Sequence, residues 1–492
     1  MNLVATRQND REETAKIACS YWNASEAAEL LLKRVLHQAE KDERDLAYYT
    51  ACKSEQARKQ SGSYYTPVDV AQFFWNQFFD AKGINDAQSA TDFLRTHRLI
   101  EPSCGSGVLV YALLAKLLAF GVPLEVMRDL DLHLVDLNDS ALQYSRLQFS
   151  LINKALGGRY FSPSFEHTDF LRYDGLCSER PVIIFGNPPF VSNAIGKTWK
   201  NTYADFMDRC LEEAAPLAAI HFIVPLSLSF SRDYSRLRNK LRTKKFSIYA
   251  SHFDNIPDTL FKSGKPQNSN SNKSNSQRCT IISVLASSEH RLLSSKMHRW
   301  NTSDRATLLS SPAHFEDVTN YQFGDQFIRP SSPEMARYLQ NQNFEYFLGD
   351  LTAPQGPFNL YVGGVARNYI SVRGGAGNGI QRFSFENRLN FYRFLGIIAS
   401  REFMDYWRTV GDGFHVTRSN IVDFPVSASF NVLLEEAIPK VKSMWIRRAR
   451  FEKMKLNSGT LVCSYDFSSA AISLTPSIPN KKQSRMVKDV YS

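Results

Sequence analysis

The sequence predicts an α/β fold whose centre is an open, doubly wound and mostly parallel β-sheet. Between Leu99 and Ser287, short apolar runs alternate with amphipathic helical segments, which is the pattern of strands covered by helices on both faces. A glycine turn follows the first of these runs, and an aspartate ends the second. Ligands of doubly wound sheets bind outside the carboxyl ends of the strands, so we expect the functional residues at that edge.

Seven strands and four connecting helices are predicted in this region. The strands lie near residues 97–101, 132–136, 164–168, 181–186, 219–225, 246–252 and 279–286. The helices lie near residues 107–120, 140–156, 203–217 and 233–243. Each helix has apolar positions at a spacing of three or four residues.

Changes in composition divide the rest of the chain. Residues 1–60 read as a helical extension, whose simplest role is packing or dimerisation. The Asn/Ser/Lys-rich segment 262–277 predicts a flexible insertion between the last two strands of the 61–287 domain. Residues 288–430, with aromatic runs separated by Gly and Pro, predict a second domain. Residues 431–492 predict a basic helix followed by a polar tail.

Composition limits the classes of partner and site. The 492 residues include 59 Lys and Arg against 49 Asp and Glu, a net charge of +10 that favours a polyanionic partner. No apolar run reaches the roughly 20 residues of a membrane helix, and no secretory signal is recognisable, so we expect a cytoplasmic protein without membrane association. The seven cysteines are scattered and form no C-x-x-C pair, so we expect no disulfide framework and no metal site.

The first predicted strand leads into a glycine turn, in the sequence LIEPSCGSGVLV from Leu99. Glycine lets the backbone approach a ligand closely, and the N-terminus of the following helix favours hydrogen-accepting groups. The segment is neither a G-x-G-x-x-G dinucleotide fingerprint nor a P-loop. Asp136 ends the next strand, at a spacing where a carboxylate can bind ribose hydroxyls. Together Gly105, Gly107 and Asp136 predict a nucleoside-type cofactor site.

The fourth strand, VIIFG from Val182, delivers Asn187, two prolines and Phe190 to the same edge. Proline fixes φ and has no N–H, so the prolines hold the Asn187 side chain and the nearby carbonyl in one orientation. An amide oxygen and a main-chain carbonyl can both accept from one exocyclic amine, while Phe190 can stack on a planar ring. An ordinary Asn-Pro turn after a buried strand is the alternative interpretation.

These segments, in this order, resemble the motifs of S-adenosylmethionine-dependent amino-methyltransferases, and specifically of the N6-adenine DNA methyltransferases of restriction-modification systems. The resemblance rests on three segments: EPSCGSG, the acidic strand end and GNPPF. In addition, SGSYYTP from Ser61 to Pro67 is similar to the Y-T-P element that precedes the cofactor loop in the gamma arrangement of these enzymes. The resemblance covers residues 61–287 closely and 380–426 loosely. It implies a Rossmann-like class I S-adenosylmethionine-dependent methyltransferase fold with a seven-stranded, mostly parallel sheet, followed by a target-recognition domain at 288–430.

The resemblance also implies a role for each matching residue. S-adenosylmethionine would be bound by Tyr65, Thr66 and Pro67 at its methionine end, by Glu101, Cys104, Gly105 and Gly107 in the loop, by Asp136 at the ribose and by Asp169 at the adenine. The target base would be bound and activated by Asn187, Pro188, Pro189 and Phe190. Phe261, in DTLF, would stack on the other face of the base. A turn or helix cap for Asp169 and a core position for Phe261 are the alternatives, and the insertion directly after Phe261 leaves that alignment open.

The implied activity is direct methyl transfer to the N6 amine of an adenine flipped out of double-stranded DNA, without a covalent intermediate or a metal. Cys104 lies in the cofactor loop and is a poor candidate for the nucleophile of cytosine-C5 chemistry. Arginines of the 288–430 domain are candidate DNA contacts: Arg367, Arg373, Arg382, Arg388 and Arg418. Three other functions remain open: a methyltransferase acting on RNA bases or protein glutamine, the modification half of a bifunctional restriction enzyme, and an inactive DNA-binding scaffold. A separate restriction endonuclease or defence subunit also remains open as a partner.

Overall fold

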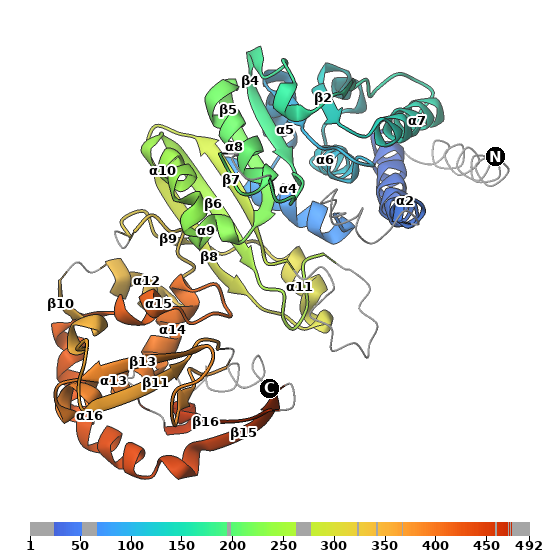
Figure 1. Cartoon of the computed structure of the whole chain (residues 1–492). Coiled ribbons are helices and arrows are strands. Elements are labelled where there is room, and N and C mark those ends of the chain that lie inside the picture. Colours follow the sequence, from blue (N-terminus) through green and yellow to red (C-terminus); the bar gives the residue numbers. More distant parts are fainter. Residues whose placement is uncertain are drawn as a thin grey trace. The chain divides into compact units, whose positions relative to one another are not determined.

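The structure, a computed structural model, describes residues 24–51, 66–193, 198–261, 277–321, 324–340, 343–366, 368–457, 460–470, 472 and 474. Contacts divide the chain into two units (Figure 1). The first ends at Leu293 and also includes His298–Phe315, and the second comprises Ser294–Met297 and the residues from Glu316 onward. Tyr65, residues 262–276 of the predicted insertion and Arg367 lie outside the described residues.

The largest sheet has the strand order β3-β2-β1-β4-β5-β7-β6-β8-β9. Its strands are β1 (Arg98–Glu101), β2 (Asp131–Asp136), β3 (Ser164–His167), β4 (Cys177–Gly186), β5 (Ala215–Pro225), β6 (Phe246–Phe253), β7 (Cys279–Ala286), β8 (Arg291–His298) and β9 (Glu316–Asp317). Strands β1 to β7 lie in the first unit, Ser294–Met297 of β8 belong to the second unit, and so does β9. Strands β3, β2, β1, β4 and β5 pair in parallel, whereas β7 is antiparallel to β5 and β6. The predicted α/β fold with a mostly parallel sheet is therefore confirmed.

All seven predicted strands are present, and the sheet extends beyond them. Strands β8 and β9 were not predicted, because RLLSSKMH has two adjacent serines and only a short apolar run, and β9 is two residues long. In the chain, the segment 262–277 lies between β6 and β7, the last two of the seven predicted strands. The strand order reverses between β1 and β4, where Leu99 lies opposite Ile183. The carboxyl ends of these two strands are neighbours, so the residues that follow them share one edge.

Helices cover both faces of this sheet, with α8 on one face and α4 and α6 on the other (Figure 1). The helices of the unit are α2 (Ala24–Ala51), α4 (Val68–Lys82), α5 (Ala87–Thr96), α6 (Val108–Ala119), α7 (Asp139–Ala155), α8 (Thr202–Glu213), α9 (Ser227–Phe230), α10 (Ser235–Thr243) and α11 (Arg305–Ser310). Helix α2, in the predicted N-terminal extension, packs against α6 and buries Leu32 and Leu36 in the core. The described part of the extension is therefore a packing element of the first unit.

Helix α4 is fixed to the sheet by buried polar groups as well as by aromatic packing. Trp75 Nε1 donates to the carbonyl of Leu109 on α6 at 2.8 Å. His221, on β5, is fully buried, and its Nε2 lies 2.8 Å from the carbonyl of Phe74. Ser283 Oγ lies 3.0 Å from the other ring nitrogen, Nδ1. Because a misplaced helix would leave these groups buried without partners, the polar contacts determine where α4 lies on the sheet.

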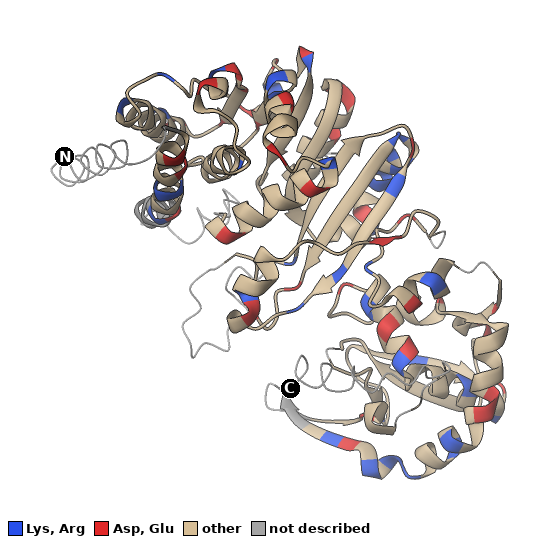
Figure 2. Cartoon of the chain, turned by 180° about the vertical axis from the view of Figure 1, so that it is seen from behind, with Lys and Arg blue, Asp and Glu red and all other residues tan. Residues whose placement is uncertain are grey.

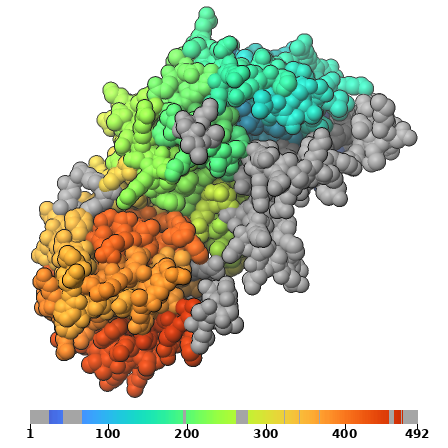
Figure 3. Space-filling model, in the orientation of Figure 1, coloured from blue at the N-terminus to red at the C-terminus, as the bar shows by residue number. Residues whose placement is uncertain are grey.

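The second unit contains a five-stranded antiparallel sheet in the order β13-β11-β12-β16-β15, a two-stranded pair β10-β14, and helices. Its strands are β10 (Phe344–Phe347), β11 (Phe358–Gly363), β12 (Val372–Arg373), β13 (Ile380–Phe385), β14 (Pro425–Ser427), β15 (Glu452–Asn457) and β16 (Thr460–Tyr465). Its helices are α12 (Pro333–Gln340), α13 (Arg388–Ile398), α14 (Arg401–Val410), α15 (Arg418–Val422) and α16 (Ala428–Ile446). In the space-filling view, its described residues form one body, coloured mainly orange to red (Figure 3).

The C-terminal part of the second unit differs from the expected basic helix. Helix α16 ends at Ile446, and the basic run continues through a 3-10 turn into β15, with Arg447 and Arg450 exposed. Figure 2 marks the Lys and Arg positions of this part of the chain in blue. The alternation in EKMKLN, followed by the turn-forming residues Ser458 and Gly459, is the sequence signal for the β15–β16 pair. Strand β16 pairs with β12, so one sheet includes residues on both sides of the predicted boundary at 430/431. Within the described ranges, no helix is both long and apolar enough to cross a bilayer.

Candidate functional site

The loop after β1 makes a tight glycine turn at the carboxyl edge of the sheet. Cys104 N donates to the carbonyl of Val135 on β2 at 3.1 Å, and Gly107 N donates to the carbonyl of Cys104 at 2.8 Å. Gly105 and Gly107 have φ of 51° and 84°, in the left-handed region that favours glycine. A Cβ atom at Gly107 would lie 3.1 Å from the Tyr111 ring. The turn therefore places backbone without side chains at the carboxyl edge of the sheet, where a ligand would bind.

Asp136, at the end of β2, is hydrogen-bonded to this turn. Its Oδ2 accepts from Gly105 N at 2.8 Å, and its Oδ1 accepts from Asn138 N at 2.8 Å. Burial raises the pKa of the Asp136 carboxyl above its ordinary value, while these backbone N–H groups oppose the shift. The sequence predicted that Asp136 binds ribose, and it did not predict that the same carboxylate holds the glycine turn in place.

Asp169 follows β3 at the same edge and is half-buried. Its Oδ1 accepts from Leu171 N at 3.0 Å, so it caps the 3-10 turn Phe170–Arg172. This is the helix-cap arrangement that the sequence left open as the alternative. A contact between Asp169 and a cofactor stays a prediction.

Asn187 follows β4 and is held from two sides. Its Nδ2 donates to Thr66 Oγ1 at 3.2 Å, and its main-chain carbonyl accepts from Ser103 Oγ at 3.3 Å. Thr66 is only 7% exposed and immediately precedes the N-cap of α4, Pro67. The structure thus brings together parts of three segments predicted separately: the Y-T-P element, the glycine loop and GNPPF. Ser103 was missed, although EPSCGSG contains it.

Pro188, Pro189 and Phe190 follow Asn187 at the carboxyl edge of the sheet. Pro188 is buried, Pro189 is half-buried, and Phe190 packs edge to face against Tyr203. Phe190 also lies against Phe261, with ring centroids 6.3 Å apart and an interplanar angle of 69°. Two parallel rings on either side of a base would be about 7–8 Å apart, because each stacked layer takes about 3.5–4.0 Å. Phe190 and Phe261 are therefore neighbours, but one ring must rotate before a base can lie between them.

The candidate arginines of the second unit interact mainly with its antiparallel sheet. Arg418 lies over the Phe383 ring, 4.5 Å from its centroid, and its Nη1 donates to the carbonyl of Arg382 at 3.0 Å. Arg382 donates to Asn359, Arg388 lies over the Phe358 ring, and Arg373 donates to the carbonyl of Cys463. Their role in binding DNA stays a prediction. Among the described residues, no group of three or more His, Cys, Asp and Glu side chains is arranged to hold a metal ion.

Comparison with known proteins finds similar solved structures. No protein-family model and no curated protein matches the chain. Similar solved structures include a DrdV–DNA complex (14% identity, TM-score 0.43), the ATP-dependent Type ISP restriction-modification enzyme LlaBIII bound to DNA (15%, 0.40) and the type I restriction-modification system methyltransferase subunit from Streptococcus thermophilus (15%, 0.33). The matches cover 68%, 76% and 51% of this chain, and 38%, 28% and 53% of those chains. The matched part is therefore less than two thirds of each of those proteins.

Proposed function

We propose that the protein is a DNA methyltransferase that transfers the methyl group of S-adenosylmethionine to the N6 amine of a flipped-out adenine, in a restriction-modification or related defence system. The observation that carries the proposal is the position of Asn187 beside the glycine turn, with its Nδ2 engaged by Thr66. Because the amide nitrogen donates within the protein, the amide oxygen is the atom that would accept from a substrate amine.

The residues present fit the proposed cofactor. The glycine turn offers bare backbone and the N-terminus of α6, and Asp136 offers a carboxylate at the adjacent strand end. When bound, S-adenosylmethionine would supply an electrophilic methyl group. Gly105, Gly107 and Asp136 would hold it, and Thr66 and Pro67 would lie at its methionine end.

Asn187 and Pro188 would activate the target amine. The lone pair of the amine is delocalised into the purine ring, which makes the nitrogen a poor nucleophile. Hydrogen bonds from its two N–H groups to Asn187 Oδ1 and the Pro188 carbonyl would localise the lone pair and orient it for in-line attack. The amine nitrogen would bond to the methyl carbon as the sulfur–methyl bond of the donor breaks, and the methylated amine would then lose one proton to water. An adenine inside a duplex cannot reach this edge, so the base must first leave the helix. The net charge of +10 favours a polyanionic substrate, and stacking on Phe190 would offset part of the cost of flipping.

Single-molecule sequencing of DNA from cells that express the protein tests the proposal. We expect N6-methyladenine in one sequence context, which also identifies the recognised sequence. With purified protein and labelled S-adenosylmethionine, Asn187→Ala should reduce methyl transfer to DNA at least about 100-fold. Asn239→Ala, a change at an exposed position of α10, is the control and should be active.

Three results would contradict the proposal. One is the absence of modified bases together with equal activity of Asn187→Ala and the unmodified protein. Another is label incorporated into RNA but not into DNA, which would indicate an RNA methyltransferase. The third is label on a protein glutamine, which would indicate a protein methyltransferase.

A further inference from the structure

Arg305, the first residue of α11, is buried and connects two segments that are distant in the sequence. It is 3% exposed. Its Nε and Nη2 donate to the two carboxylate oxygens of Asp69 at 2.6 and 3.0 Å. Its Nη1 and Nη2 also donate to the carbonyls of Thr259 and Leu260, at 2.8 Å each. A guanidinium can make all four bonds because its donors form a rigid planar fork.

The two connected segments carry residues of the proposed site. Asp69 lies on the first turn of α4, three positions after Thr66, which accepts from Asn187. Leu260 immediately precedes Phe261, which contacts Phe190. Arg305 is therefore attached on one side to the helix that follows the partner of Asn187 and on the other to the backbone beside Phe261.

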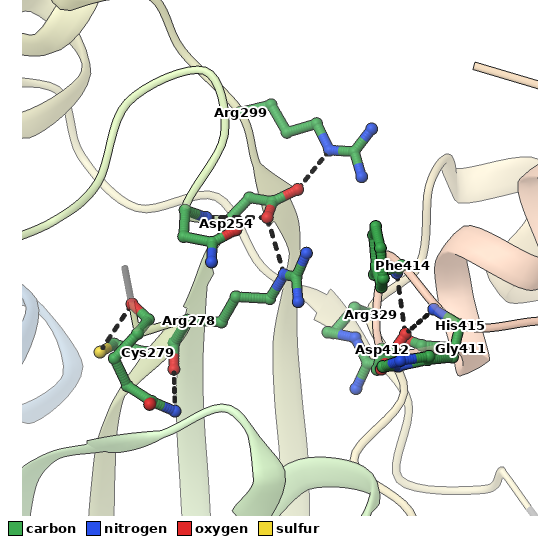
Figure 4. Close-up of polar contacts among 11 residues, drawn as sticks. Asp254, Arg278, Cys279, Arg299, Arg329, Gly411, Asp412, Phe414 and His415 are labelled. Atoms are coloured by element: carbon green, nitrogen blue, oxygen red, sulfur yellow. Dashed lines mark hydrogen bonds and ion pairs between the residues drawn. The ribbon is translucent and has the colours of Figure 1, made fainter. Parts of the chain in front are cut away.

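We call residues Asp254–Phe261, which follow β6, the Phe261 loop. Its first residue, Asp254, is also anchored: the buried carboxylate accepts from Arg278 Nε at 2.8 Å and from Arg299 Nε at 2.5 Å (Figure 4). Asp254 N donates to the carbonyl of His298 at 2.9 Å, and Asp258 N donates to the carbonyl of Trp300 at 3.2 Å. The loop is thus bound at its start by Arg278 and Arg299, and Arg305 binds its end, where Phe261 lies.

We propose that Arg305 is a positioning residue for methyl transfer, which sets the place of Phe261 relative to the Thr66–Asn187 pair. This inference rests on the proposed function. Both hydrogen bonds from Arg305 to this loop go to backbone carbonyls, so the guanidinium holds the backbone itself. Without it, the Phe261 ring would lose its fixed distance from the amide, and a flipped base would be held less often in the geometry that Asn187 activates.

The test compares variants of the full-length protein, with DNA from a strain lacking N6-methyladenine as the methyl acceptor. Arg305→Met keeps a long apolar side chain but removes all four hydrogen bonds, and we expect kcat to fall about 100-fold. The Kd for S-adenosylmethionine should rise by a much smaller factor than kcat falls, because the four hydrogen bonds of Arg305 go to Asp69, Thr259 and Leu260 rather than to Asp136 or the glycine turn. Arg305→Lys should recover part of kcat, since an ammonium can still reach some of the four acceptors.

Two further variants separate positioning from stability. Asp69→Asn removes the charge of the partner but leaves the bonds to Thr259 and Leu260, so it should fold and lose less kcat than Arg305→Met. Arg98→Met breaks the ion pair with Asp131 at the amino end of β1, on the opposite edge of the sheet. It should lower Tm while leaving kcat unchanged.

The outcomes distinguish this inference from the proposed function. If the unmodified protein transfers no methyl group to DNA, the proposed function fails, and this inference fails with it. If the unmodified protein is active, the positioning role is overturned when Arg305→Met retains kcat within twofold. It is also overturned when kcat and the cofactor affinity fall by the same factor, or when Arg98→Met lowers kcat as much as Arg305→Met does. Should Arg305→Met fail to fold, unchanged kcat in both Arg305→Lys and Asp69→Asn would overturn it.

Discussion

Asn187 Nδ2 donates a hydrogen bond to Thr66 Oγ1 at 3.2 Å, across a sequence separation of 121 residues. The bond engages the donor end of the amide, so under the proposed function the amide oxygen is the atom that would accept from the substrate amine. Replacing Thr66 with Val removes the hydroxyl at almost constant volume. We expect kcat for methyl transfer to fall about 10-fold, the value of one hydrogen bond near 1.4 kcal/mol. Thr66→Ser keeps the hydroxyl and should stay near the unmodified rate, and equal rates for the two variants would contradict the assigned orientation.

If Asp136 holds the cofactor as proposed, cofactor binding should depend on pH. Burial raises the pKa of this carboxyl, so it takes up a proton at a higher pH than an ordinary aspartate. The ionised form is the one suited to hold two ribose hydroxyls, so affinity for S-adenosylmethionine should be constant at high pH and fall as the pH decreases through the raised pKa. Isothermal titration calorimetry between pH 8 and pH 5 measures this.

Two variants control the Asp136 experiment. Asp136→Asn should bind the cofactor weakly at every pH, without the dependence. Asp131→Asn, at the amino end of β2, should keep the profile of the unmodified protein. A flat profile for the unmodified protein would contradict the assignment of Asp136.

Phe261 is expected to contribute stacking energy rather than chemistry. Phe261→Leu keeps most of the apolar volume of this buried side chain but removes the aromatic face. Stacking of a base on an aromatic ring contributes about 1–3 kcal/mol, so KM for DNA should rise about 5-fold or more while the cofactor Kd stays unchanged. Phe253→Leu makes the same change at a fully buried position near Phe73 and Trp300. It should lower Tm without raising KM, and a similar KM for both variants would exclude stacking on Phe261.

His221 makes the first unit sensitive to acid. Its burial lowers the pKa of the imidazole to about 3, from 6.5. The unfolded chain takes up a proton near pH 6.5 whereas the folded chain does not, so stability is fully present above about pH 6.5 and is lost as the pH falls toward 3. The contribution is about 1.4 kcal/mol per pH unit over that window.

The measurement for His221 is urea unfolding at pH 7.5, 6.0 and 5.0. His221→Gln cannot take up this proton, so its free energy of unfolding should fall less steeply between pH 6.0 and 5.0 than that of the unmodified protein. The difference in free energy of unfolding between the two proteins at pH 7.5 serves as the baseline, because the imidazole is largely unprotonated in both the folded and the unfolded chain at that pH. Parallel curves for the two proteins would contradict the buried neutral imidazole.

The sheet could be predicted because its signals are local. A run of branched residues such as VIIF forms a buried strand wherever it pairs, and a Gly-x-Gly after a strand needs a turn. The second unit was predicted less well, because its strands are short and their apolar positions are satisfied only by partners far along the chain. Strand β16, for example, pairs with β12 about 90 residues earlier. The role of Arg305 could not be predicted for the same reason, because nothing in the sequence around this arginine indicates that the distant Asp69 is its partner.

The sequence by itself determined the α/β class, the order of the strand ends and the chemical groups placed there: glycine backbone, the Asp136 carboxylate, the Asn187 amide and the Phe190 ring. Only the tertiary structure decided how these groups constrain one another. In the folded chain, Asp136 is hydrogen-bonded to Gly105, and Asn187 is hydrogen-bonded to both Thr66 and Ser103. Arg305 is hydrogen-bonded to the backbone beside Phe261. The physical reason is that a strand's pattern depends on its own residues, whereas a hydrogen bond between distant segments depends on where the packed sheet and helices bring them.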